Sequence, residues 1–345
     1  MLETLGFDRN SLHRAYAQGL DAADVIAEYR RRTMAVGDPG IFLHQLSDDD
    51  LAAAIAALPP FDPDSHPLWG LPFAVKDNID VAGMPTTAAC PAFTYTPSAD
   101  APVVARLRAA GAIAVAKTNL DQFATGLVGV RTPYPVPRNA LDQAIVPGGS
   151  SSGSAVAVAH GLVTLALGTD TAGSGRVPAA LNNIVGLKPS LGALSTRGVV
   201  PACRTLDCVS IFALTVDDAW AAFAAAAAVD PDDPYSRDRP AGAYGPCPPT
   251  LKIGVPTPTS RRFFGDTLQA AMFEAVLADL EELGAEPVPV DLEPFYAVAA
   301  LLYEGAWVAE RLAAIEGFMA KAPEALHPTT RAIIDGARGL SLIHI

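Results

Sequence analysis

Charged residues are scarce in this chain: Asp, Glu, Lys and Arg make up only 18% of its 345 residues. Hydrophobic residues make up 50%, so a large core can form and global disorder is excluded. Basic residues are outnumbered by acidic ones, 24 against 37, which gives a net charge of −13. Because nucleic acids and anionic membranes attract basic surfaces, the sequence predicts neither as a partner. A small anionic substrate, which needs only one or two local cations, remains compatible with this charge.

Long hydrophobic runs are absent as well. The longest uninterrupted run, Ala219–Val229, has 11 residues, which is too short to cross a bilayer. The N-terminus, Met1-Leu2-Glu3, lacks the basic start and apolar segment of a secretory leader. The sequence therefore predicts neither a membrane span nor secretion.

Cysteine is rare, with only Cys90, Cys203, Cys208 and Cys247 in the whole chain. They form no Cys-x-x-Cys pair and have no histidines at the spacing of a zinc site. We therefore expect buried free thiols in a reducing compartment, which favours the cytoplasm. No metal and no other cofactor are expected.

Helical and strand-like patterns alternate along the chain, which predicts an α/β fold with a parallel or mixed sheet. The expected helices lie at 102–111, 155–161 and 267–283, and the expected strands at 71–76, 112–116, 164–168, 251–255 and 286–290. No internal repeat or long linker interrupts them, which favours one compact domain. The Pro- and Gly-rich stretch 230–249 is expected to be a surface excursion.

Two loops of small residues, 148–154 and 169–175, flank one helix and one strand. Such loops can converge at one edge of a sheet and point their backbone N–H groups into a common space, as an oxyanion site requires. A flexible linker is the alternative for the first loop. Its position inside apolar, periodic sequence argues against that alternative.

The first loop also matches the Gly-x-Ser-x-Gly nucleophile elbow, with Ser151 as the nucleophile. That motif needs a buried strand before it and a catalytic histidine later in the chain. The preceding residues are only weakly strand-like, and the later histidines are His160, His327 and His344. His160 at a helix–strand corner is better interpreted as structural, so the elbow is disfavoured.

A serine nucleophile without histidine needs another base, and Lys76 is the candidate. It follows an apolar extended run, so its amine should emerge at the end of a strand. Burial disfavours the charged form of lysine and lowers its pKa from about 10.4 towards neutrality. The alternative is a structural ion pair with the adjacent Asp77, which the local sequence leaves open.

Three blocks of sequence together resemble the amidase signature family. They are GLPFAVKDNIDVAGMPTT (70–87), PGGSSSGS (147–154) and GTDTAGSGRVPAALNNIVGLKP (168–189). The resemblance implies an α/β/α sandwich with a large twisted mixed sheet and a Ser–cis-Ser–Lys triad. In this chain the nucleophile would be Ser174, the bridging serine with a cis peptide Ser150, and the base Lys76.

The resemblance also implies an oxyanion hole formed by the backbone N–H groups of Thr171, Ala172, Gly173 and Ser174. Small residues in this loop let a planar amide approach the backbone closely. Asp170 and Arg176 flank the nucleophile loop, and we assign them to structural pairing rather than catalysis.

Further segments are similar to the allophanate hydrolase branch of the family, namely 119–129, 131–134 and 172–178, the last of which contains Gly175. The substrate-binding pair of that branch, a Tyr and an Arg eight residues apart on one helix, matches Tyr303 and Arg311. Eight helical residues rise about 12 Å and turn about 80° net, so the two would lie on neighbouring faces. The resemblance implies release of ammonia from allophanate in urea degradation, and a functional link to urea carboxylase.

The resemblance covers nearly all of residues 1–339, which we expect to be an amidase domain that is incomplete at its C-terminus. Residues 340–345 look like a translated adapter sequence and are predicted to be a non-native tail. An N-terminal helix pair is compatible with a homodimer. Two alternatives remain open: another amidase, such as the glutaminase subunit of a tRNA-dependent amidotransferase, and an inactive fragment that acts as an interaction module.

Overall fold

The computed structural model describes residues 2–238, 241–242 and 250–340, and these form two compact units. Met1–Ala241 and Val308–Ile345 belong to the first unit, and Gly242–Trp307 to the second. The sequence alone favours one compact domain, whereas the contacts divide the chain into two. The boundary of the amidase domain at residue 339 stays a prediction. Of the predicted non-native tail, residues 341–345 lie outside the described residues.

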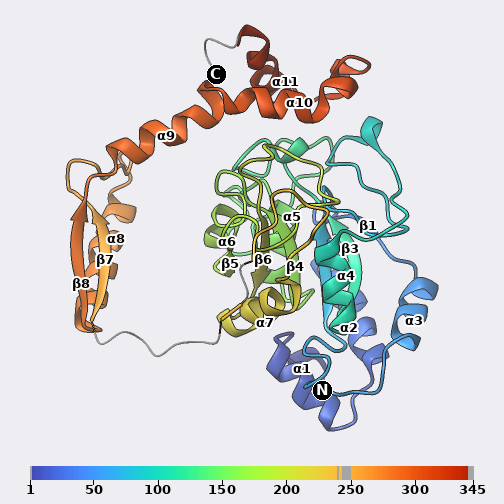
Figure 1. The fold of residues 1–345 in the computed structure, drawn as a ribbon. Helices are drawn as coiled ribbons and strands as arrows, with labels where there is room; N and C mark the ends of the chain where they lie inside the picture. The colour runs from blue at the N-terminus through green and yellow to red at the C-terminus, as the bar shows by residue number, and fades with distance from the viewer. Residues whose placement is uncertain (1, 239–240, 243–249, 341–345) are drawn as a thin grey trace. The chain divides into compact units, whose positions relative to one another are not determined.

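A six-stranded mixed sheet forms the centre of the first unit, in the order β1-β3-β2-β4-β6-β5 (Figure 1). The strands are β1 (Phe42–Gln45), β2 (Pro72–Lys76), β3 (Ile113–Thr118), β4 (Leu165–Thr169), β5 (Val185–Leu187) and β6 (Val209–Ala213). β3, β2 and β4 run parallel, while β1, β6 and β5 are antiparallel to the strands beside them. The predicted mixed sheet is confirmed.

Helices cover both faces of this sheet. The helices of the first unit, of which α3 to α7 pack against its strands, are α1 (Arg9–Ala17), α2 (Ala22–Val36), α3 (Asp48–Ala56), α4 (Pro102–Ala109), α5 (Ser152–Ala159), α6 (Val177–Leu181), α7 (Val216–Ala226), α10 (Trp307–Met319) and α11 (Pro328–Asp335). α4 joins β2 to β3, and α5 joins β3 to β4 in the opposite direction across the sheet. Because parallel crossovers are right-handed, α4 and α5 lie on opposite faces. β2, β3, β4 and β6 are consequently buried along their whole length, and the α/β/α architecture is confirmed.

Polar side chains determine where several of these helices begin. Asp8, Asp21, Ser47 and Thr215 each accept a hydrogen bond from a backbone N–H of the first turn of α1, α2, α3 and α7, respectively. Such N-cap residues satisfy donors that have no partner within the helix.

The second unit contains a parallel pair of strands, β7 (Leu251–Pro256) and β8 (Ala285–Val290), joined by α8 (Thr267–Glu282). α9 (Glu293–Glu304) follows β8. The alternation of strand, helix and strand expected here is confirmed. No helix among the described residues is long and apolar enough to cross a membrane.

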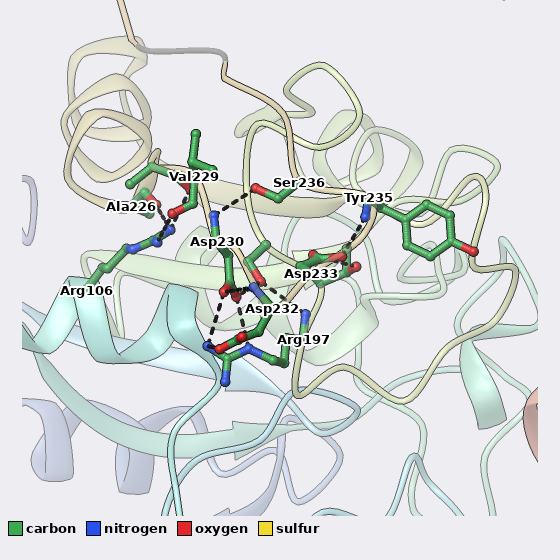
Figure 2. Close-up of polar contacts among 12 residues, drawn as sticks. Arg106, Arg197, Ala226, Val229, Asp230, Asp232, Asp233, Tyr235 and Ser236 are labelled. Atoms are coloured by element: carbon green, nitrogen blue, oxygen red, sulfur yellow. Dashed lines mark hydrogen bonds and ion pairs between the residues drawn. The ribbon is translucent and has the colours of Figure 1, made fainter.

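Two arginines hold the segment that follows α7 (Figure 2). Arg106 on α4 donates to the carbonyls of Ala226 and Val229, both at 3.1 Å. Arg197 donates to both carboxylate oxygens of Asp230, at 3.0 and 3.3 Å. The buried Asp233 accepts hydrogen bonds from the backbone N–H and the hydroxyl of Thr196, the residue before Arg197. Positions 231, 232, 234, 235, 237 and 238 are exposed, so the start of 230–249 lies on the surface as predicted, with the buried Asp230 and Asp233 tying it down; residues 239–240 and 243–249 lie outside the described residues.

Replacing Asp230 by alanine should lower the free energy of unfolding by about 1–3 kcal/mol. The buried carboxylate accepts from Ser195 Oγ at 2.7 Å as well as from Arg197, and its loss leaves those donors unsatisfied. Urea titration followed by circular dichroism measures the change. Asp232→Ala is the matched control: Asp232 is exposed and 3.9 Å from Arg197, so its loss should change stability by less than about 0.5 kcal/mol. Equal losses for the two variants would contradict this assignment.

Candidate active site

Lys76 lies at the carboxyl end of β2 and is completely buried. Its Nζ is 2.7 Å from Ser150 Oγ and 2.7 Å from Thr169 Oγ1. Thr169 ends β4, the parallel neighbour of β2, so the ends of two adjacent strands bring these groups together. The carboxyl edge of parallel strands is where α/β proteins commonly place their sites.

Burial lowers the pKa of Lys76 to about 7, although the carboxylates of Asp121, Asp170 and Asp207 oppose the change. The charged amine is disfavoured because the site excludes the water that would solvate it. A lysine with this pKa is substantially neutral at and above neutral pH. It can therefore accept a proton from a hydroxyl in contact with it.

The adjacent carboxylate, Asp77, pairs with another residue. Its Oδ1 lies 3.2 Å from Nζ of Lys117, which is buried on β3. Lys117 also donates to Thr86 Oγ1 at 3.0 Å. The ion pair with Asp77, which was the alternative role for Lys76, is thus formed by Lys117. The amine of Lys76 contacts the hydroxyls of Ser150 and Thr169 instead.

Ser150 is buried, and the Gly149–Ser150 peptide bond is cis, as the family resemblance implies. Two backbone hydrogen bonds fix this turn: Gly149 N–H donates to Leu127 O at 2.9 Å, and Asp121 N–H donates to Ser150 O at 3.0 Å. The segment 121–131 therefore holds the bridging serine in place.

Ser174 lies between β4 and α6 and is almost completely buried. Its Oγ is 3.4 Å from the carbonyl oxygen of Gly126, so the segment 121–131 contacts this serine as well. In the described part of the chain, no hydrogen bond joins the hydroxyls of Ser150 and Ser174. The structure thus brings Lys76 and Ser150 into direct contact and places Ser174 against the same segment.

The carboxylate of Asp170 organises the nucleophile loop. It accepts from the N–H groups of Gly173 and Gly175, at 2.7 and 3.0 Å, and from Nε and Nη2 of Arg176. Burial raises the pKa of Asp170, but Arg176 and the loop N–H groups outweigh that effect and lower it overall. The predicted structural pairing of Asp170 with Arg176 is confirmed.

That network affects the predicted oxyanion hole. The N–H of Gly173 already donates to Asp170, so it is not a free donor. Thr171, Ala172 and Ser174 stay as the predicted donors.

Arg311 on α10 is buried, and its Nη1 donates to Thr125 Oγ1 at 3.1 Å. Thr125 directly precedes Gly126, whose carbonyl contacts Ser174. The guanidinium therefore contacts the segment 121–131, which also contacts Ser174.

The prediction that Tyr303 and Arg311 share one helix is wrong. Tyr303 lies on α9, which ends at Glu304, and α10 begins only at Trp307. Gly305 adopts an extended conformation, and a Cβ there would lie 2.9 Å from Leu301 O. Glycine thus lets the chain leave the helix at this point, and helical spacing does not relate the two side chains. Tyr303 belongs to the second unit, and its role stays a prediction.

Three polar residues of the site were not found from sequence. Thr169 contacts Lys76, Thr125 contacts Arg311, and Asp207 accepts from the hydroxyl of Thr171 at 2.5 Å. Thr169 could have been noticed as the first residue of a small-residue loop after a strand. Asp207 has no local signal as a residue of the site, because its contact with Thr171 joins positions 36 apart.

The disfavoured elbow serine, Ser151, is buried and donates to the carbonyl of Thr169 at 3.2 Å. Cys90, Cys203 and Cys208 are buried free thiols, as expected, and Cys247 lies outside the described residues. No group of three or more His, Cys, Asp or Glu residues in the described ranges is arranged to hold a metal ion.

A buried lysine in contact with a cis-peptide serine, beside a second Gly/Ser loop on an α/β/α sandwich, is typical of a class of amide-cleaving proteins. The Amidase family profile matches residues 24–338, and the chain belongs to this family. Two urea-related proteins are similar to it. The urea amidolyase of Saccharomyces cerevisiae is 52% identical over 283 residues, which cover 81% of this chain and 15% of that protein. The allophanate hydrolase of Kluyveromyces lactis is 43% identical, with a TM-score of 0.91, over 99% of this chain and 56% of that one.

A relative of another kind is also similar. One component of the glutamyl-tRNA(Gln) amidotransferase of Symbiobacterium thermophilum is 42% identical over 284 residues, 79% of this chain and 58% of that protein. This chain thus spans 15%, 56% and 58% of the lengths of these three relatives, respectively.

Proposed function

We propose that this protein hydrolyses allophanate (urea-1-carboxylate), a small anionic amide, and releases ammonia in urea degradation. The observation that carries the proposal is the 2.7 Å contact between the buried amine of Lys76 and Ser150 Oγ. The similarity to urea amidolyase and to allophanate hydrolase supports the choice of substrate.

In the proposed mechanism, neutral Lys76 accepts the proton of the Ser150 hydroxyl while Ser150 accepts the proton of Ser174. Ser174 Oγ attacks the carbon of the terminal amide and forms a tetrahedral intermediate. The N–H groups of Thr171, Ala172 and Ser174 stabilise the oxyanion that develops there. The serine–lysine relay then returns a proton to the leaving nitrogen, and the C–N bond breaks to release ammonia.

Water completes the cycle. The relay removes a proton from a water molecule, which attacks the acyl-enzyme ester and restores the Ser174 hydroxyl. The product is N-carboxycarbamate, which loses CO2 spontaneously or in a separate domain. No imidazole takes part in any of these steps.

Substrate recognition is assigned to Arg311 and Tyr303. Allophanate carries a carboxylate at the end opposite the scissile amide, and a guanidinium offers two parallel donors to such a group. The hydrogen bond to Thr125 orients the guanidinium of Arg311. The hydroxyl of Tyr303 would add one directed hydrogen bond.

Ammonia release from allophanate, measured with glutamine in parallel, tests the proposal. Release from allophanate alone supports it. Release from glutamine alone would favour the second candidate, a glutaminase that works within an amidotransferase, which the 42% identity to an amidotransferase component supports. Release from neither substrate would contradict both candidates.

Arg311→Ala should raise KM for allophanate about 10- to 100-fold and change kcat less. A charge-assisted hydrogen bond contributes about 1.5–3 kcal/mol, and the carboxylate would lose more than one. Steady-state kinetics on allophanate and on an uncharged amide measure the difference. Arg331→Ala is the control, since Arg331 pairs at the surface with Asp335. An equal loss on the uncharged amide would contradict the assigned role.

The remaining expectations are also proposals: a cytoplasmic homodimer that acts after a urea carboxylase. The similarity to urea amidolyase supports the link to urea carboxylation. Light scattering coupled to size-exclusion chromatography measures the mass of the protein in solution. A mass of one chain would contradict the dimer.

A further inference from the structure

The buried carboxylate of Asp207 is tied to the nucleophile loop. Thr171 Oγ1 donates to Asp207 Oδ1 at 2.5 Å, three residues before Ser174. The same carboxylate accepts from the backbone N–H of Ala202 at 2.9 Å and of Cys203 at 3.1 Å. Asp207 thus fixes the start of its own loop, 202–207, to the loop that would hold the oxyanion.

The other side of loop 202–207 is tied to α10. Glu310 accepts from Thr205 Oγ1 at 2.7 Å, from Thr205 N–H at 3.0 Å and from Cys203 Sγ at 3.2 Å. Glu310 directly precedes Arg311, and both side chains belong to the first unit. One short loop therefore contacts both the helix that carries Arg311 and Thr171, one of the predicted oxyanion donors.

We propose that loop 202–207 is a positioning bridge, in which Asp207 and Glu310 are positioning residues. The bridge couples placement of the substrate carboxylate at Arg311 to placement of the oxyanion donors at 171–174. This inference rests on the proposed function. The inference adds to the proposed function two residues that do not touch the substrate, since the carboxylates of Asp207 and Glu310 act through the loop.

The protonation states suit this role. Burial, together with the carboxylate of Glu310, raises the pKa of the Cys203 thiol to about 12, so the thiol stays protonated and can donate. Burial raises the pKa of Glu310, but the hydrogen bonds from Thr205 outweigh it and lower the pKa overall, so Glu310 stays an acceptor. Burial also raises the pKa of Asp207, although the hydrogen bonds from Thr171, Cys203 and Ala202 and, least, the charge of Arg311 oppose that rise.

Thr205→Val removes the 2.7 Å hydrogen bond to Glu310 at an exposed position and keeps the size of the side chain. We expect kcat/KM for allophanate to fall about 3- to 10-fold, the loss of one hydrogen bond. Thr205→Ser keeps the hydroxyl and should restore most of the activity. Glu310→Ala removes all three hydrogen bonds that Glu310 accepts from Thr205 and Cys203, so we expect a larger fall in kcat/KM.

A double-mutant cycle with Thr171→Val tests the coupling. Thr171→Val breaks the bridge at Asp207, and we expect it to lower kcat more than it raises KM. If one bridge carries both effects, the loss in Thr171→Val/Thr205→Val is smaller than the product of the two single losses. Losses that multiply would overturn the proposal. The cycle uses whichever amide the wild-type protein hydrolyses, so a wrong substrate assignment does not affect its result.

Hydrogen exchange provides a measurement that needs no activity. In Thr205→Val, the amides of 170–176 should exchange at least about threefold faster than in wild type, and those of Thr205→Ser should match wild type. Faster exchange confined to 202–207 would show that the loop is only locally structural, and would overturn the bridge even if no substrate were hydrolysed.

Discussion

Replacing Ser174 by alanine should lower kcat for ammonia release by about four to six orders of magnitude. The variant removes the only atom that can form the acyl-enzyme in the proposed mechanism, and the remaining groups can stabilise but not replace it. Folding should be unaffected, because Ser174 Oγ makes one long contact, 3.4 Å from Gly126 O. Steady-state kinetics with coupled detection of ammonia measure the effect.

Ser152→Ala is the matched control for this variant. Ser152 is also a buried serine, at the start of α5, and its hydroxyl makes a single 3.5 Å contact with Asn119 O. It lies outside the proposed relay, so kcat should change by less than about threefold. A kcat for Ser174→Ala within tenfold of wild type would contradict the assignment of the nucleophile.

The parts of the site that follow from local sequence could be predicted. An apolar extended run ending in lysine predicts that the amine of Lys76 emerges at a strand end, and the structure confirms that position. The small residues of 148–154 and 169–175 predict two loops at one edge of the sheet, and Lys76 contacts the first residue of the second loop and Ser150 of the first. The strand end and the two loops each depend on neighbours within about ten residues, whereas the contacts between them join positions 74 and 93 apart.

Features that depend on distant partners could not be predicted. The pairing of Asp77 with Lys117 joins two strands, and the contact of Arg311 with Thr125 spans 186 positions. Gly175 is a further example: a Cβ there would lie 2.5 Å from Ser210 Cβ on β6, a contact that only the folded sheet creates. The break between α9 and α10 was missed for another reason, since a single glycine inside a helical pattern is often tolerated.

Replacing Lys76 by methionine should lower kcat by about three to five orders of magnitude, because no other base in the described part of the chain contacts Ser150 Oγ. In the wild-type protein, kcat/KM should rise with pH through a midpoint near the lysine pKa of about 7 and then level off. The direction follows from the role: only the deprotonated amine can accept the serine proton. Any residual activity of Lys76→Met should lack this midpoint. A wild-type profile that falls as the pH rises through 7 would contradict a lysine base.

The same substitution should change how stability depends on pH. The pKa of Lys76 is about 7 in the folded protein, below the ordinary value of 10.5 for an accessible lysine. Between these values the unfolded chain binds more protons, so this group makes the free energy of unfolding rise with pH, by at most about 1.4 kcal/mol per unit. Other groups titrate as well, but the difference between wild type and Lys76→Met isolates position 76. Urea unfolding at pH 7, 8 and 9 measures both proteins. As the pH rises, the free energy of unfolding of the wild type should increase relative to that of Lys76→Met, so the variant should be most stable relative to the wild type at pH 7. Parallel pH dependences would show that burial does not hold the amine neutral, and the base would then have to be found elsewhere.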